Sequence, residues 1–95
     1  MDAQKLAANN PASPPEMLAS LSQDEDYEIR FGVARNPSTP PYILTILAQD
    51  ENDMVRWMVA RNASTPTEAF AILINDKVSG VRRGVQQNPS YSASA

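Results

Sequence analysis

The chain contains neither cysteine nor histidine, and only three of its 95 residues are glycine. Without cysteine there is no disulfide framework, thiolate metal site or thiol nucleophile, and without histidine the commonest general base is missing. The three glycines are not clustered, so no phosphate-binding loop is present. We therefore expect a protein that is not an enzyme and that has neither a cofactor nor a metal site.

Long hydrophobic runs and an excess of positive charge are also missing. The longest apolar stretches lie around residues 42–48 and 69–74, far short of the roughly 20 residues that a transmembrane helix needs. The first residues have neither the apolar core nor the basic lead-in of a secretory signal, so we expect a soluble, cytoplasmic protein. The net charge of −3 makes a dedicated nucleic-acid-binding protein unlikely, because such proteins carry a basic excess.

What the sequence does contain is a set of residues that recur every 26 positions. The recurring polar residues are Asn10, Asn36, Asn62 and Asn88; Asp24, Asp50 and Asp76; and Arg30, Arg56 and Arg82. The recurring apolar residues include Ile29, Val55 and Val81; Val33, Val59 and Val85; and Leu21, Leu47 and Leu73. Self-similarity at one fixed offset is the signature of a tandem array.

The array predicts a single domain over residues 1–90. It would consist of an N-terminal cap helix at 2–9 and units at about 10–35, 36–61 and 62–87. Residues 91–95 are expected to be a disordered C-terminal tail, because they contain small polar residues beyond the last recognisable helix.

Each unit is expected to hold two helices. Residues 54–61 carry apolar side chains at helical spacing after an acidic run that suits a helix N-terminus, and Asn62 would end this helix in the left-handed conformation. Thr65 and Pro66 then indicate the N-cap and first residue of a second helix, part of which could be 3₁₀. Neither helix can bury its apolar side alone, so stacked units would form an α-solenoid around one continuous core.

The pattern Val-Arg-x-x-Val-Ala-x-Asn-Pro-x-Thr-Pro-x-x-x-Leu-x-x-Leu resembles the leucine-rich repeat variant family. Here it runs from Ile29 to Leu47 and recurs from Val55 to Leu73, where Ala63 replaces the first proline and Phe70 a leucine. The resemblance covers about residues 7–90. It implies an all-α, right-handed superhelix of alternating α-helices and short α- or 3₁₀-helices, similar to HEAT and armadillo arrays. Some members also carry a cysteine cluster for iron and sulfur, which this chain does not share.

The recurring polar residues are interpreted as structural. We expect each of the three arginines to pair with one of the three aspartates at the turn between units. The four asparagines are expected to hydrogen-bond the backbone of a neighbouring unit, because buried amides require partners. The alternatives, a cationic stripe for anionic partners and an amide-lined binding strip, are less favoured.

One further recurring position varies in residue type: Phe31, Trp57 and Arg83. It lies off the inward side of the helix, and Arg35 and Arg61 follow the two aromatic residues by one turn, so that the side chains can make contact. Aromatic and arginine side chains are favoured anchors of protein interfaces. We therefore predict a non-catalytic scaffold that binds a protein or peptide partner through these five residues; the alternative is that they pack against the neighbouring helix.

Two other roles are weighed against this one. Arg35, Arg61, Arg82 and Arg83 could bind the phosphate backbone of a nucleic acid, although the interspersed acids would weaken the attraction. The chain could instead be a structural oligomerisation unit. For its uncapped C-terminal end we expect either self-association or an unusually polar last face.

Overall fold

The computed structural model describes residues 2–94, and within this range the chain contains helices and no strand. The all-α fold expected from the sequence is therefore confirmed. Its helices are α1 (Ala3–Ala8), α2 (Pro15–Leu21), α3 (Tyr27–Arg35), α4 (Pro41–Leu47), α5 (Asp53–Arg61), α6 (Thr67–Leu73), α7 (Ser79–Gln87) and α8 (Pro89–Ser94). Of these described helices, none is both long and apolar enough to cross a membrane.

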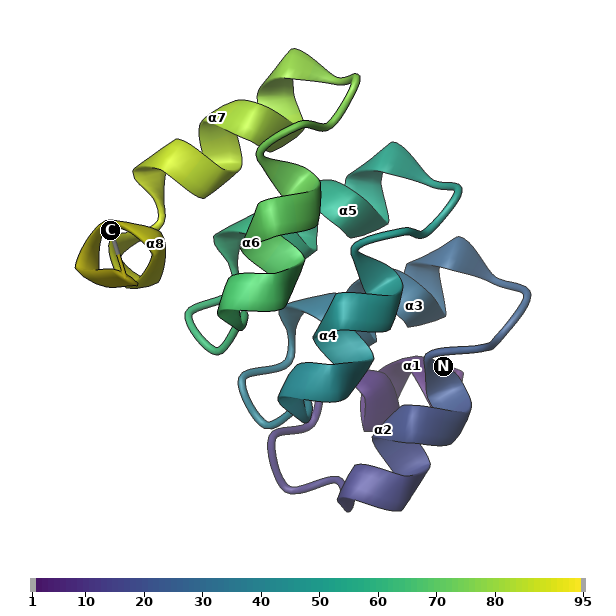
Figure 1. The fold of residues 1–95 in the computed structure, drawn as a ribbon. Helices are drawn as coiled ribbons and strands as arrows, with labels where there is room; N and C mark the ends of the chain where they lie inside the picture. The colour runs from purple at the N-terminus through teal and green to yellow at the C-terminus, as the bar shows by residue number, and fades with distance from the viewer. Residues whose placement is uncertain (1, 95) are drawn as a thin grey trace.

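The odd-numbered helices form one layer and the even-numbered helices a second. In the first layer α1 packs on α3, α3 on α5 and α5 on α7, so these helices lie side by side in chain order. In the second layer α4 packs on α6 and α6 on α8, and Figure 1 shows α2, α4 and α6 in front of the first layer. The molecule measures 37 × 23 × 18 Å, which is the elongated shape that stacked helix pairs produce.

The core lies between the two layers and continues along the stack. The first layer contributes a pair of valine or isoleucine side chains from each of its last three helices, all at most 2% exposed: Ile29, Val33, Val55, Val59, Val81 and Val85. The second layer covers them with Leu18, Leu21, Leu44, Leu47, Phe70 and Leu73. Each helix therefore buries its apolar side against its neighbours, as no single helix of this length could do in isolation.

Helices α2, α4 and α6 of the second layer are α-helical, each with a proline as its N-cap. The Pro40 carbonyl oxygen accepts from the amides of Ile43 and Leu44 at 3.0 and 3.3 Å, and the Gln49 amide donates to the Ile46 carbonyl oxygen at 3.1 Å, so 3₁₀-type bonds occur at both ends of α4. The expectation that Thr65 caps α6 is wrong by one residue. Thr65 is buried, and its hydroxyl donates to the Val59 carbonyl oxygen at 2.6 Å.

The asparagines that follow the first-layer helices are extended, so the left-handed conformation expected of them is wrong. Asn62 has φ −73° and ψ 129°, and no residue of the described range has a positive φ, glycines included. In this conformation the side chain of Asn62 turns back to the preceding helix pair, where its amide nitrogen donates to the Ala34 carbonyl oxygen at 2.8 Å. The side-chain hydrogen bonds thus replace the capping bonds of a left-handed helix end.

The disordered tail expected over residues 91–95 is not observed. Helix α8 continues to Ser94, and Ala95 lies outside the described residues. Helix α8 is held at its start, where the Ser90 amide donates to the Asn88 side-chain oxygen at 2.9 Å. The Tyr91 ring packs edge-on against Phe70, with centroids 5.4 Å apart. This aromatic contact covers the last part of the core. It was not expected from the sequence, because no full-length second helix follows α7.

Candidate functional site

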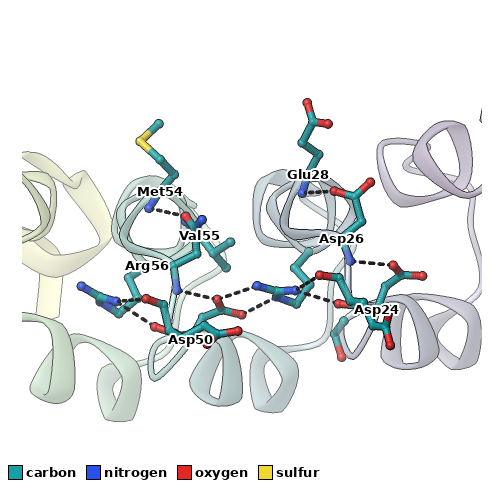
Figure 2. A network of polar contacts seen from close by, with 12 residues as sticks. Asp24, Asp26, Glu28, Asp50, Met54, Val55 and Arg56 are labelled. Carbon is teal, nitrogen blue, oxygen red and sulfur yellow. Dashed lines mark hydrogen bonds and ion pairs between the residues drawn. The ribbon is translucent and has the colours of Figure 1, made fainter.

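Arg56 is buried and joins two successive turns, the one before α5 and the one before α7. Its Nε donates to Asp76 Oδ2 at 2.8 Å, and its Nη1 donates to the backbone oxygens of Asp50 and Glu51 at 2.8 and 3.3 Å. Arg30 makes the equivalent bonds, with Asp50 as its carboxylate partner at 2.8 Å, and Figure 2 shows how these turns link. Each of these arginines thus pairs with the carboxylate of the following turn and with the backbone of its own.

Arg82 repeats this arrangement only in part. Its Nη1 donates to the Asp76 backbone oxygen, but no carboxylate of residues 2–94 lies within 4.0 Å of its guanidinium group. The side chain is half-buried rather than buried. Arg82 therefore shares the backbone contact of the other two arginines without their ion pair.

The aspartates of this ladder shape the turns as well as pairing with arginine. Asp50 Oδ1 accepts from the Asn52 amide at 2.9 Å, and Asn52 in turn caps α5 by accepting from the Met54 amide at 2.8 Å. Asp24 and Asp26 form the same relay at the start of α3, as Figure 2 shows. The carboxylates are therefore committed to holding the backbone.

The electrostatics of the ladder agree with this role. Burial alone would raise the pKa of Asp76, but hydrogen bonds from Arg56 and from the Val78 amide outweigh it, and the pKa lies below its ordinary value of 3.8. The hydrogen bond from Arg30 to Asp50 raises the pKa of the Arg30 guanidinium. Both groups are therefore charged across the neutral pH range.

The asparagines join consecutive helix pairs through the backbone. The Asn36 amide nitrogen donates to the oxygens of Ala8 and Asn10, both at 2.9 Å, and its own side-chain oxygen accepts from the Ser38 amide. Asn62 donates in the same way to the oxygens of Ala34 and Asn36, and Asn88 to those of Ala60 and Asn62. Asn10 is exposed and caps a local turn by accepting from the Ala12 amide. The buried asparagines fill their hydrogen-bonding capacity within the scaffold.

Apolar hollows lie on both sides of Met54, on the outer surface of the first layer. One hollow of about 320 Å³ lies between α1, α3 and α5, and it is lined by Lys5, Asn9, Tyr27, Glu28, Phe31, Arg35 and Met54. The other, also of about 320 Å³, lies between α5 and α7 and is lined by Asp53, Met54, Trp57, Val78, Gly80 and Val81. Met54 is 46% exposed and belongs to both, so the hollows form one surface, in which polar side chains border the first hollow and apolar ones most of the second.

Three of the five residues predicted to bind a partner, Phe31, Arg35 and Trp57, line this surface, and Arg61 lines neither hollow but stacks on Trp57 beside it. The Arg61 guanidinium lies 5.0 Å from the centre of the Trp57 ring, and Phe31 and Arg35 line the first hollow together. Both aromatic side chains are half-buried and pack against the core, so they support the helices as well as lining the surface. Arg83 is exposed on α7 and lines neither hollow.

Sequence reasoning did not identify all the exposed apolar side chains. Met54 and Tyr27 complete the surface described above, and Tyr42 and Ile46 of α4 are 61% and 55% exposed on the second layer. The last two line a shallow hollow of about 480 Å³. The sequence did contain a signal for this exposed pair. Tyr42 and Ile46 are one helical turn apart, on the side of α4 opposite its buried leucines.

Residues 27–52 match the leucine rich repeat variant, a family of helical repeats. The segment starts with α3 and ends at the turn before α5, so it is one helix pair with its arginine and its asparagine. The resemblance noted in the sequence is confirmed over this segment. Comparisons with curated proteins and with solved structures gave no significant match.

Proposed function

We propose that the chain is a non-catalytic helical-repeat scaffold that binds a protein partner over the outer surface of α3, α5 and α7. The observation that carries this proposal is the pair of apolar hollows that share Met54, with Trp57 beneath the Arg61 guanidinium. Aromatic residues, methionine and arginine are the residue types enriched where proteins bind one another. The absence of histidine and cysteine from the sequence favours binding over catalysis.

The scaffold itself is proposed to be a right-handed solenoid of 26-residue units. In support of this unit length, the side-chain bonds of Asn36, Asn62 and Asn88 have partners at the same separations of 26 and 28 residues. The two buried arginines likewise both reach a carboxylate 20 residues ahead. Such a ladder holds neighbouring helices at constant spacing, which reduces the entropy that the scaffold loses on binding.

Nucleic-acid binding is a weaker explanation of the same arginines. Arg30 and Arg56 are buried and engaged with carboxylates, so they are not available to phosphates. Glu28 lines the first hollow with Arg35, and Asp53 stands at the start of the helix that ends with Arg61, so their charges oppose a polyanion.

A third possible function is self-association through the C-terminal end, but the polarity of that end disfavours it. Gln86 of α7 stands where Ala34 and Ala60 are buried in the preceding helices, and it is exposed together with Arg83. A polar end face of this kind is what keeps stacked repeats soluble.

The experiment that tests the proposed function compares two single substitutions in an affinity capture from cell extract. Trp57→Ala removes the half-buried aromatic floor of the first-layer surface, and Tyr42→Ala removes a more exposed aromatic side chain from the second layer. We expect proteins that are retained by the unsubstituted chain and by Tyr42→Ala to be lost with Trp57→Ala. Retention of every captured protein by the Trp57→Ala variant would contradict the proposal, provided that circular dichroism shows the variant to be folded.

A further inference from the structure

The cations of this protein fall into two classes according to their partners. Lys5, Arg30 and Arg56 each have a carboxylate within 4.0 Å. Within residues 2–94 the other five cations, Arg35, Arg61, Lys77, Arg82 and Arg83, have no carboxylate at ion-pair distance. Of these, the exposed Arg35 and Arg61 end the two helices that carry Phe31 and Trp57. These two guanidinium groups are therefore open to an acid from outside the chain.

The parallel order of the first-layer helices sorts charge into rows across the surface. Arg35 and Arg61 occupy the last turns of α3 and α5, whereas Glu28 and Asp53 occupy the first turns of the same helices. Because α3 and α5 lie side by side, the arginines lie at one edge and the acids at the other. Arg35 and Glu28 both line the first hollow, and Asp53 lines the second. A partner that fits must present carboxylates along one edge and apolar groups beside them.

We infer that the partner segment is an extended acidic peptide, and this inference rests on the proposed function. Its carboxylates bind Arg35 and Arg61, and its apolar side chains fill the hollows beside Met54. Packed helices lie about 8–10 Å apart, and a polyproline II chain advances about 9 Å per turn of three residues. Acidic residues at positions i and i+3 of such a chain therefore face successive arginines of the edge.

Peptide carboxylates suit this site better than nucleic-acid phosphates. A phosphate backbone is charged along its whole length, so it would bring negative charge over Glu28 and Asp53 as well as over the arginines. A peptide places its charges at chosen positions and its apolar residues elsewhere. A carboxylate also matches the fork of a guanidinium group in a bidentate hydrogen bond, the type of pairing that Arg30 already makes with Asp50 through Nε and Nη2.

The direct test uses defined peptides and the full chain, with binding followed by fluorescence anisotropy. The probe is a labelled peptide of four Glu-Leu-Pro triplets, which repeats an acid every third residue in an extended conformation. One control peptide has lysine in place of glutamate, and another has the same composition with the glutamates clustered at one end. We expect the first peptide to bind more tightly than either control, and equal binding of the lysine peptide would overturn the inference.

Matched variants locate the binding site. The double variant Arg35→Gln, Arg61→Gln should bind the acidic peptide about tenfold more weakly, whereas Lys77→Gln, which removes an exposed cation from the turn before α7, should not change the affinity. Both variants alter exposed side chains, and thermal unfolding monitored by circular dichroism verifies that they fold. Unchanged affinity in the double variant, or tighter binding of a single-stranded oligonucleotide than of the acidic peptide, would refute acidic-peptide recognition.

The two proposals fail in different ways. Cellular proteins that depend on Trp57 but are still captured by the double arginine variant would overturn the acidic-peptide inference and leave the proposed function intact. Cellular proteins that do not depend on Trp57 would contradict the proposed function itself.

Discussion

At the scale of single residues, the arginine and aspartate ladder separates scaffold from surface. Residues of one type at a regular offset invite the interpretation of a charged stripe, yet Arg30 and Arg56 are at most 9% exposed and bound to carboxylates and carbonyl oxygens. Arg35 and Arg61, which follow five residues later in each case, are exposed. Burial and partners therefore assign different roles to side chains of identical chemistry.

The ladder predicts that equivalent arginines differ in their contribution to stability. Arg56→Ala should lower the free energy of unfolding by about 2–3 kcal/mol, because it leaves the Asp76 carboxylate and two carbonyl oxygens without their donor. Arg82→Ala should cost less than about 1 kcal/mol, since Arg82 is half-buried and has no ion pair within the described residues. Urea denaturation of both variants measures the difference. Equal losses would show that the ion pair to the following turn adds nothing.

The lowered pKa of Asp76 predicts an acid-dependent loss of stability. A carboxyl group whose pKa is lower in the folded state stabilises the fold above its unfolded pKa, and this contribution disappears as the pH falls through the folded value. The ordinary value is 3.8, so the contribution should be complete at neutral pH and decline below about pH 4. Asp76→Asn should therefore be less stable than the unsubstituted protein at pH 7, with a gap that narrows towards pH 3. A gap that is constant with pH, in unfolding curves recorded at both values, would show that Asp76 does not contribute in this way.

At the scale of secondary-structure elements, sequence periodicity predicted the helices well and their ends less well. The first-layer helices and their buried valines follow from a 3.6-residue pattern. The caps depend on competition between hydrogen bonds: Thr65 binds the Val59 carbonyl oxygen and leaves the cap to Pro66, and Asn62 binds across helix pairs. Helix α8 depends on tertiary contacts, the Tyr91–Phe70 ring contact and the Ser90 hydroxyl's bond to the Ala63 carbonyl oxygen, which no local pattern contains.

The candidate site was likewise predictable from the sequence only in part. Trp57 and Arg61 were predictable because their spacing of four residues places them together on a helix. Met54 was not, since its place between two hollows depends on how α3, α5 and α7 pack. The position of Arg83 outside the hollows also depends on how these helices pack, so the sequence alone did not predict it.

Close packing of the first-layer helices predicts that replacing two glycines of α7 by alanine has opposite effects on stability. A Cβ atom at Gly84 would lie 3.0 Å from the Ala60 Cβ of α5, whereas a Cβ atom at Gly80 would meet nothing within 4 Å. Gly84→Ala should cost about 1 kcal/mol, because crowding at the helix contact exceeds the gain in helix propensity. Gly80→Ala should raise stability by about 0.5 kcal/mol. Thermal unfolding of the two variants measures both effects, and a stabilising Gly84→Ala would mean that α5 and α7 can separate without loss.

At the scale of the whole molecule, stability is distributed along a stack in which each helix pair contacts its immediate neighbours. The first-layer contacts run from α1 to α3, then to α5 and α7, and each junction carries one asparagine bridge. Two buried ion pairs, Arg30 with Asp50 and Arg56 with Asp76, also join successive turns. In such an array the loss of one contact acts first on the adjoining helices.

This arrangement predicts that a leucine in the middle of the stack matters more than an apolar residue at its end. Leu47 of α4 is 2% exposed, whereas Leu6 of α1 is 56% exposed. Leu47→Ala should cost about 2–5 kcal/mol, because it leaves a cavity between the layers, and Leu6→Ala should change stability by less than about 0.5 kcal/mol. In the Leu47→Ala variant, amide hydrogen exchange should accelerate most in α4 and in α3, α5 and α6, which pack on it. Similar losses for the two variants in urea denaturation would contradict a core shared along the stack, because an unshared interior would not distinguish its middle from its end.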